Sequence, residues 1–73
     1  MNDRIAVNES VCHGKPVIRG TRVPVAVVLG SLAGGMTYDE VQAEYDIVRE
    51  DILAVLHFAE EIVEKEQYYT LSN

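Results

Sequence analysis

Three basic side chains and two glycines lie close together near the start of the chain, in the stretch GKPVIRGTRVP. The basic residues are Lys15, Arg19 and Arg22. Arginine can contact a phosphate through two parallel hydrogen bonds, and glycine lets a backbone approach a ligand closely. The three side chains are therefore candidates for contact with DNA or another anion. They could equally neutralise an acidic helix of this chain or of a second subunit, and the sequence leaves both interpretations open.

The order of residues in this stretch argues against a nucleotide-binding P-loop. That loop places four residues between two glycines and then has Gly-Lys-Ser/Thr directly before a helix. Here Lys15 follows the first glycine, and Pro16 follows Lys15. We therefore expect no nucleotide hydrolysis.

Few residues could form a metal site or a catalytic group. A structural zinc ion usually takes four Cys or His ligands, and the chain has only Cys12, His13 and His57. The acids of residues 60–64 have the spacing of a solvated helix face rather than of an acid/base pair. We predict a protein that is not an enzyme and that needs no cofactor or metal.

Charge is divided unevenly along the chain, which has a net charge of −6. Residues 1–36 carry four basic and two acidic residues, a net charge of +2, whereas residues 37–73 carry two basic and ten acidic residues, a net charge of −8. An anion would therefore meet the first half of the chain, and a basic partner would meet the second.

The length of 73 residues predicts one domain with a marginal core, because so short a chain buries only about 60% of its unfolded surface. A lone cysteine cannot form an intrachain disulfide, no signal peptide is expected, and a reducing cytoplasm is the natural location. No stretch approaches the ~20 apolar residues of a membrane span. Small domains need additional support, and we expect this one to form a homodimer.

A short N-terminal β arm is expected over residues 1–23, with Ile5–Val7 pairing with Val17–Ile18. Two strands this short need a helix to pack on. Pro24 fits the first turn of a helix, since its missing N–H is not needed there. Gly34 and Gly35 would end that helix.

Two further helices complete a mainly α fold, with three helices over residues 24–67. Thr37-Tyr38-Asp39-Glu40 forms a capping box that begins a short helix ending near Tyr45. The longest helix runs from Arg49 to about Gln67, and residues 68–73 form a tail.

Apolar residues on the longest helix exceed what a small monomer can cover. One stripe follows three- and four-residue spacing: Ile52, Val55, Leu56, Ala59, Ile62 and Val63. Leu53 and Phe58 lie off that stripe, so apolar surface remains for a second subunit or partner. The candidate interface residues are Leu53, Phe58, Ile62 and Tyr69.

The short helix, turn and longer helix have the dimensions of a helix-turn-helix. In a DNA reader, the first residues of the second helix enter the major groove. Here they are Arg49, Glu50 and Asp51, and the two acids would face phosphates. The architecture fits DNA reading and the chemistry does not.

Three blocks of the sequence resemble the bacterial and archaeal family of domains of unknown function 433. They are GKPVIRGTRVPV, LAGGMTYDEV and EYDIVREDILAVLHFAEE, and the resemblance covers about residues 5–62. Two positions depart from the family pattern: Asp46 replaces a proline, and Arg49 replaces a helix-capping threonine. The longest helix is therefore expected to lack its usual cap unless Asp46 supplies one. The residues that match in the first block are Gly14, Lys15, Pro16, Ile18, Gly20, Thr21 and Arg22.

The resemblance implies a homeodomain-like three-helix unit with an N-terminal β hairpin, commonly dimeric. It also implies an antitoxin that neutralises a PIN-type nuclease toxin and, in some members, binds operator DNA. We expect a non-catalytic antitoxin-like module. The alternatives are a stand-alone DNA-binding transcriptional regulator and a structural or assembly protein without a toxin.

Overall fold

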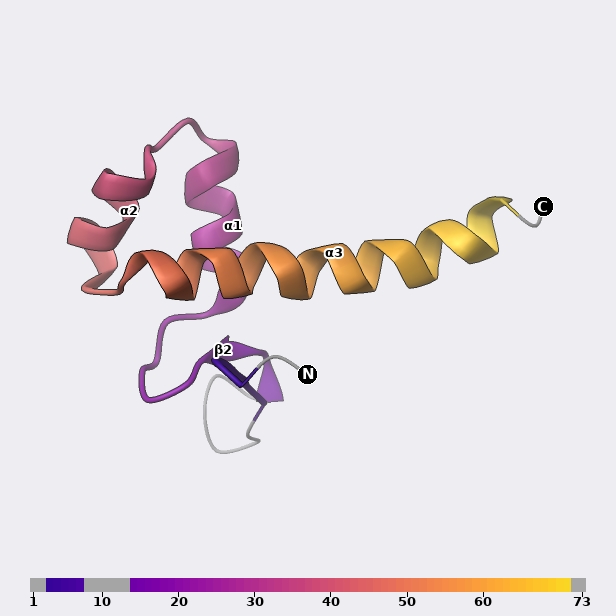
Figure 1. Ribbon diagram of the computed structural model, residues 1–73, viewed down its shortest axis with the longest axis horizontal. Coiled ribbons are helices and arrows are strands. Elements are labelled where there is room, and N and C mark those ends of the chain that lie inside the picture. Colours follow the sequence, from indigo (N-terminus) through magenta and orange to yellow (C-terminus); the bar gives the residue numbers. More distant parts are fainter. Residues whose placement is uncertain (1–2, 8–13, 72–73) are drawn as a thin grey trace.

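The computed structural model describes residues 3–7 and 14–71, with side chains through residue 65. Helices α1 and α2 lie on one side of the long helix α3, and the β hairpin lies on the other (Figure 1). This arrangement confirms the predicted mainly helical fold with a short N-terminal hairpin. The elements are β1 (Ile5–Ala6), β2 (Val17–Ile18), α1 (Val25–Ala33), α2 (Tyr38–Tyr45) and α3 (Arg49–Leu71).

The hairpin pairs β1 with β2 in antiparallel register, with Ile5 opposite Ile18 and Ala6 opposite Val17. Ile5, Val17 and Ile18 are buried, so the hairpin contributes to the core. Val7 was expected to extend the first strand, but it lies beyond the strand end and is 64% exposed.

Helix α1 begins directly after Pro24, which adopts extended backbone angles (φ −69°, ψ 142°) as the N-cap residue. The proline therefore precedes the first turn rather than forming part of it. Val25 and Val28 are buried on the inner face. At the other end, Gly35 takes a φ of 101° beyond the helix, a conformation that glycine adopts without steric strain.

The predicted capping box of α2 is confirmed. The Glu40 backbone N–H donates to the Thr37 hydroxyl at 3.1 Å, and the Thr37 backbone N–H donates to the Glu40 carboxylate at 2.8 Å. The helix ends at Tyr45, as expected, and the hydroxyl of Tyr45 lies 2.7 Å from that of Ser31 on α1. This hydrogen bond joins the two shorter helices.

The turn between α2 and α3 depends on Asp46, which has left-handed backbone angles (φ 54°, ψ 50°). Proline could not adopt them, because its ring fixes φ near −65°. Asp46 ends α2, but the cap of α3 comes from Asp51, whose carboxylate accepts the Val48 backbone N–H at 3.1 Å. As expected, the usual threonine cap is absent at the start of α3, but Asp51 supplies a substitute that was not predicted.

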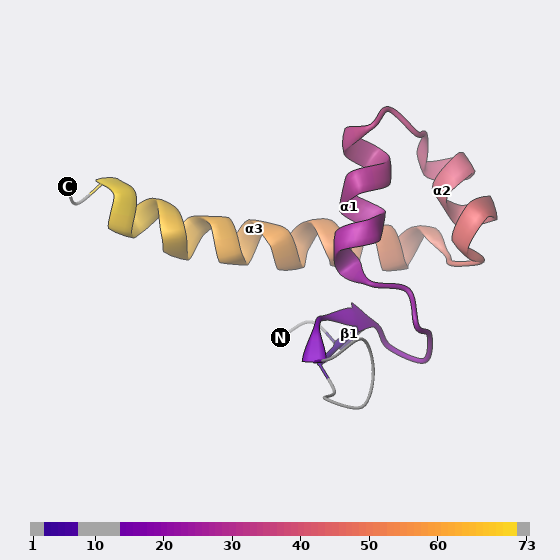
Figure 2. The same cartoon turned by 180° about the vertical axis from the view of Figure 1, so that it is seen from behind.

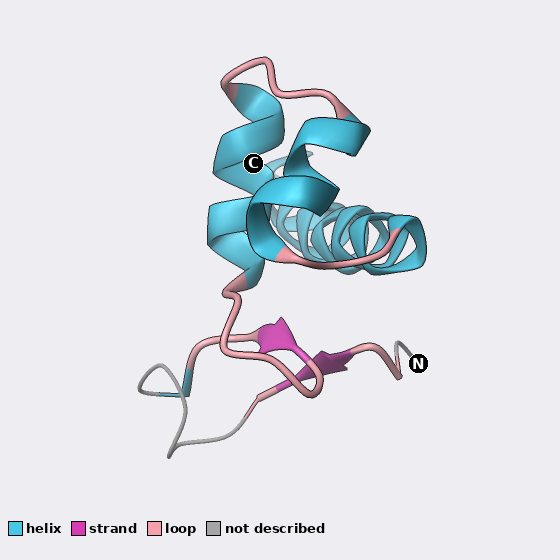
Figure 3. Ribbon diagram, turned by 90° about the vertical axis from the view of Figure 1, so that its left-hand side faces the viewer, coloured by secondary structure: helices cyan, strands magenta, loops and turns pink. Residues whose placement is uncertain are grey.

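The core lies between the two short helices, the hairpin and the first half of α3 (Figure 3). The second half of α3 projects past all other elements, as the two opposite views show (Figures 1 and 2). Helix α3 also continues to Leu71, so residues 68–71 are helical rather than part of a separate tail. The buried apolar residues are Ile5, Val17, Ile18, Val25, Val28, Val41, Ile47, Ile52 and Val55.

Candidate protein-interaction surfaces

One face of α3 combines acids with an exposed leucine. Leu53 is 46% exposed, and it lies one helical turn from both Glu50 and His57. The His57 ring lies 3.4 Å from the Glu60 carboxylate, and Glu64 follows one turn later. We call these five residues the acidic face. All five are exposed, so the face is open to a partner.

A second surface of α3 is apolar and continues the core stripe outward. Ile52 and Val55 are fully buried, whereas Ile62 is 43% exposed and Val63 is 57% exposed. The periodic stripe predicted from the sequence is therefore divided. Its first half is buried in the core of the chain, and Ile62 and Val63 in its second half remain partly exposed.

An apolar groove of about 340 Å³ lies where the start of α1 faces the middle of α3. Pro16, Pro24, Val25, Ala26 and Leu29 form one wall, and Phe58, Ala59, Ile62 and Val63 form the other. Among the described residues, Lys15 is the single charged one that lines the groove. No carboxylate among the described side chains pairs with the Lys15 ammonium.

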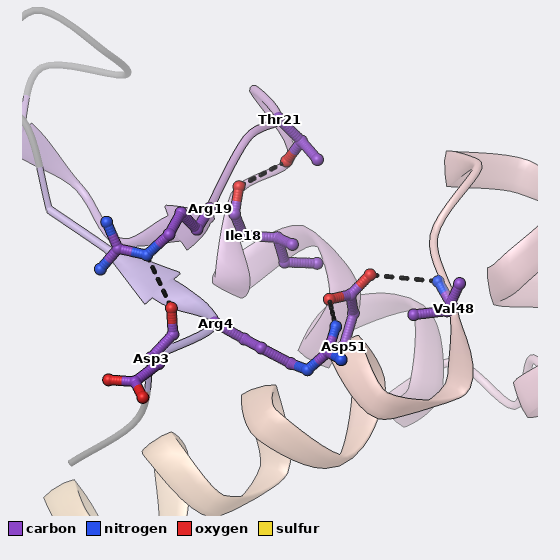
Figure 4. Close-up of polar contacts among 7 residues, drawn as sticks. All are labelled: Asp3, Arg4, Ile18, Arg19, Thr21, Val48 and Asp51. Atoms are coloured by element: carbon purple, nitrogen blue, oxygen red, sulfur yellow. Dashed lines mark hydrogen bonds and ion pairs between the residues drawn. The ribbon is translucent and has the colours of Figure 1, made fainter.

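The three anion-binding candidates have different surroundings. Lys15 lines the apolar groove, and Arg22 is exposed between β2 and α1. Arg19 folds back on the hairpin, where its Nε donates to the Asp3 carbonyl at 2.6 Å (Figure 4). Its Nη2 donates to the Ile5 carbonyl at 3.3 Å. Arg19 therefore holds the arm together, and DNA or anion contact by these residues stays a prediction.

The four interface candidates also separate. Leu53 belongs to the acidic face, whereas Ile62 belongs to the exposed apolar stripe. Phe58 is half-buried, packs against the core and lines the groove. The side chain of Tyr69 lies outside the described residues. The sequence grouped the four positions together, but α3 presents the three with described side chains on two surfaces.

A contact that sequence reasoning missed connects the arm to α3. Arg4 Nη1 lies 3.0 Å from one carboxylate oxygen of Asp51, while the other oxygen accepts the Val48 N–H (Figure 4). An acid at the third position of a helix, three residues after the N-cap residue, is a local signal for capping. Nothing local identifies Arg4 as its partner, because the two residues lie 47 positions apart.

The start of α3 offers little to a DNA phosphate or base. The Arg49 guanidinium lies over the Tyr38 ring, 4.8 Å from its centroid, in a cation–π contact. Asp51 pairs with Arg4, and Glu50 is exposed. The start of α3, which would enter the major groove of DNA, therefore presents the Glu50 carboxylate to solvent. Its arginine, Arg49, stacks on Tyr38 of the same chain.

Among the described residues, no group of three or more His, Cys, Asp or Glu side chains could hold a metal ion. Cys12 and His13 lie outside the part of the chain that the structure describes. Over that same part, no helix combines the length and apolar character that a membrane crossing needs.

Comparison with known proteins gives a family match over residues 5–59, to the family described as "Protein of unknown function (DUF433)". The structure is similar to that of a DUF433 member protein from Anabaena variabilis ATCC 29413, with a TM-score of 0.78, 29% identity, and coverage of 92% of this chain and 67% of that chain. It is also similar to Rv2018 from Mycobacterium tuberculosis, with a TM-score of 0.66 and 31% identity. That similarity covers 71% of this chain but only 24% of Rv2018. No curated protein matches the chain.

Proposed function

The chain belongs to the DUF433 family of proteins of unknown function, and we propose that it is a non-catalytic, cytoplasmic, antitoxin-like module that binds and neutralises a PIN-type nuclease toxin. The observation that supports this proposal best is the acidic face of α3. It extends from the helical body onto the projecting half of the helix, where a partner protein can reach it.

The chemistry of the acidic face suits a nuclease as partner. A nuclease must attract a polyanion, so its substrate surface is basic. An acidic helix is complementary to such a surface, and that complementarity speeds and steers the encounter. Leu53 adds an apolar contact among the acids, which a partner can remove from water. The acids would then direct binding, and the leucine would slow dissociation.

We propose that the module acts as a homodimer. Ile62 and Val63 remain exposed in the protomer, and the chain has a small core. A second copy that covers these residues would add apolar burial that one chain of 73 residues cannot provide for itself.

Operator binding is a second candidate function, which the order of α2, turn and α3 favours because it has the form of a helix-turn-helix. It ranks second because the exposed acid at the start of α3 would repel phosphates. A gel-shift experiment with the DNA upstream of the gene tests it, using Lys15→Ala/Arg22→Ala. Arg19 is a poor probe, since its guanidinium holds β1 in place.

Co-expression of the tagged chain with the product of the adjacent gene tests the proposed function. We expect the two proteins to co-purify and the nuclease activity of the partner to fall. Leu53→Lys should abolish co-purification, because it removes the apolar contact and places a positive charge against the basic surface of the partner. Val27→Lys is a matched control, because Val27 is 40% exposed and lies on α1 rather than on α3. Failure of the wild type to form a complex would refute the proposal, as would equal loss in both variants.

A further inference from the structure

The apolar lining of the groove and the ammonium group of Lys15 can both find partners on a second copy of this chain. We propose that the projecting half of α3 from one protomer packs into the groove of its partner, and that the partner's α3 does the same in return. This inference rests on the homodimer of the proposed function. It goes further because it assigns the dimer contact to two surfaces, the groove of one protomer and the projecting half of α3 of the other.

The first support is the continuity between the groove and the uncovered part of α3. Ile62 and Val63 line the groove, and they are also the exposed residues of the projecting stripe. A two-fold interface uses the same patch on both subunits. Each α3 can therefore form a wall of its own groove while it fills the groove opposite. An interface of this kind covers both apolar surfaces in one contact.

The second support is charge. Lys15 lies at the groove without a carboxylate partner among the described side chains. Glu61 directly precedes Ile62 on the projecting half of α3 and is exposed, whereas Glu60 and Glu64 lie on the acidic face, about half a helical turn away from Ile62. A second copy would thus bring the Glu61 carboxylate toward Lys15 as it brings Ile62 toward the apolar walls. The net charge of −6 on each copy opposes association, but salt screens it beyond about 10 Å, whereas contacts within the groove are shorter.

A small-molecule ligand fits the groove less well. Ligand pockets place several polar groups so that they converge on the ligand and fix its orientation. The described lining of this groove has one ammonium group, and its other side chains are aliphatic or aromatic. One wall of the groove is formed by α3, which continues past the other elements as a helix (Figure 1). Such a surface favours an amphipathic helix as its occupant.

Sedimentation velocity at micromolar concentration tests the proposal with variants on both walls. The wild type should sediment at twice the monomer mass of 8.1 kDa. Ile62→Asp on one wall and Ala26→Arg on the other should both sediment as monomers. Val27→Asp lies on α1 but does not line the groove, so it should stay dimeric. Circular dichroism should show unchanged helicity, because Ile62, Ala26 and Val27 are exposed in the protomer.

A titration of the dimer gives an independent readout. Lys15→Glu should raise the dimer dissociation constant about tenfold or more, because like charges would then meet at the groove. A dimer that withstands Ala26→Arg would overturn the groove assignment and leave the homodimer standing. A monomeric wild type would overturn both. If the Val27→Asp control dissociated as readily as the two groove variants, the groove assignment would also be rejected. None of these outcomes depends on toxin binding, which co-purification measures separately.

Discussion

One arginine holds the N-terminal arm together, and another joins the arm to α3. Arg19 satisfies the carbonyls of Asp3 and Ile5, and Arg4 pairs with Asp51 at the start of α3. The Asp51 carboxylate uses its second oxygen to accept the Val48 N–H, so one side chain both caps a helix and receives the arm. These roles explain why only part of the basic character of the first half is available for an external anion.

We predict that Asp51→Ala destabilises the protein more than Arg4→Ala does. Arg4→Ala removes one ion pair between side chains that are 49% and 13% exposed, so its cost should be about 1 kcal/mol or less. Asp51→Ala removes the pair and the cap together and should cost about 2 kcal/mol. Urea denaturation measures both free energies of unfolding. Equal costs would show that the cap contributes nothing to stability.

Asp46 supports a second prediction at the same scale. Its φ of 54° lies in the left-handed region, where glycine is free of the strain that other residues bear. Asp46→Gly should therefore raise the free energy of unfolding by up to about 1 kcal/mol. Asp46→Pro should lower it by more than that, because proline can neither reach this φ nor donate the N–H that bonds to Gln42. Thermal melts that rank Pro at or above Asp would contradict the assigned turn.

Local signals predicted most element boundaries well where neighbouring residues mark them. The Thr37/Glu40 capping box and the glycines after α1 fix two boundaries through contacts within a few positions. The Arg4–Asp51 pair and the apolar groove depend on segments that meet only after folding, so residue spacing in the sequence could not predict them. The periodic stripe of α3 predicted apolar residues correctly, but it could not tell which half the protomer itself buries.

Helix α3 should also differ in stability along its length. Ile52 and Val55 are fully buried, whereas residues 60–65 are exposed in the protomer. Hydrogen exchange should therefore show slow amides around residues 52–55 in all variants, since these open only with the core. Amides at residues 60–65 should be protected in the dimer and should exchange faster in Ala26→Arg. Equal exchange in the two proteins would mean that no second copy covers this segment.

At the scale of the whole molecule, the two halves of the chain have different tasks. The half with a net charge of +2 supplies the arm and one wall of the groove, while the half with −8 supplies the long helix. The mainly helical fold and the family could be predicted from the sequence, since the blocks that carry them lie in order along the chain. The separation of the acidic face from the apolar stripe could not be predicted, because it depends on which side of α3 packs against the other helices and the hairpin.

Titration calorimetry of the chain against the product of the adjacent gene tests the central claim, that the acidic face binds a basic protein partner. Wild-type binding should weaken as salt is raised, because charge complementarity contributes to it. Glu64→Lys should raise the Kd about tenfold or more, while Glu44→Lys, an equal charge change at an exposed position on α2, should change it little. A Kd that is insensitive to salt and equal in the two variants would contradict the account.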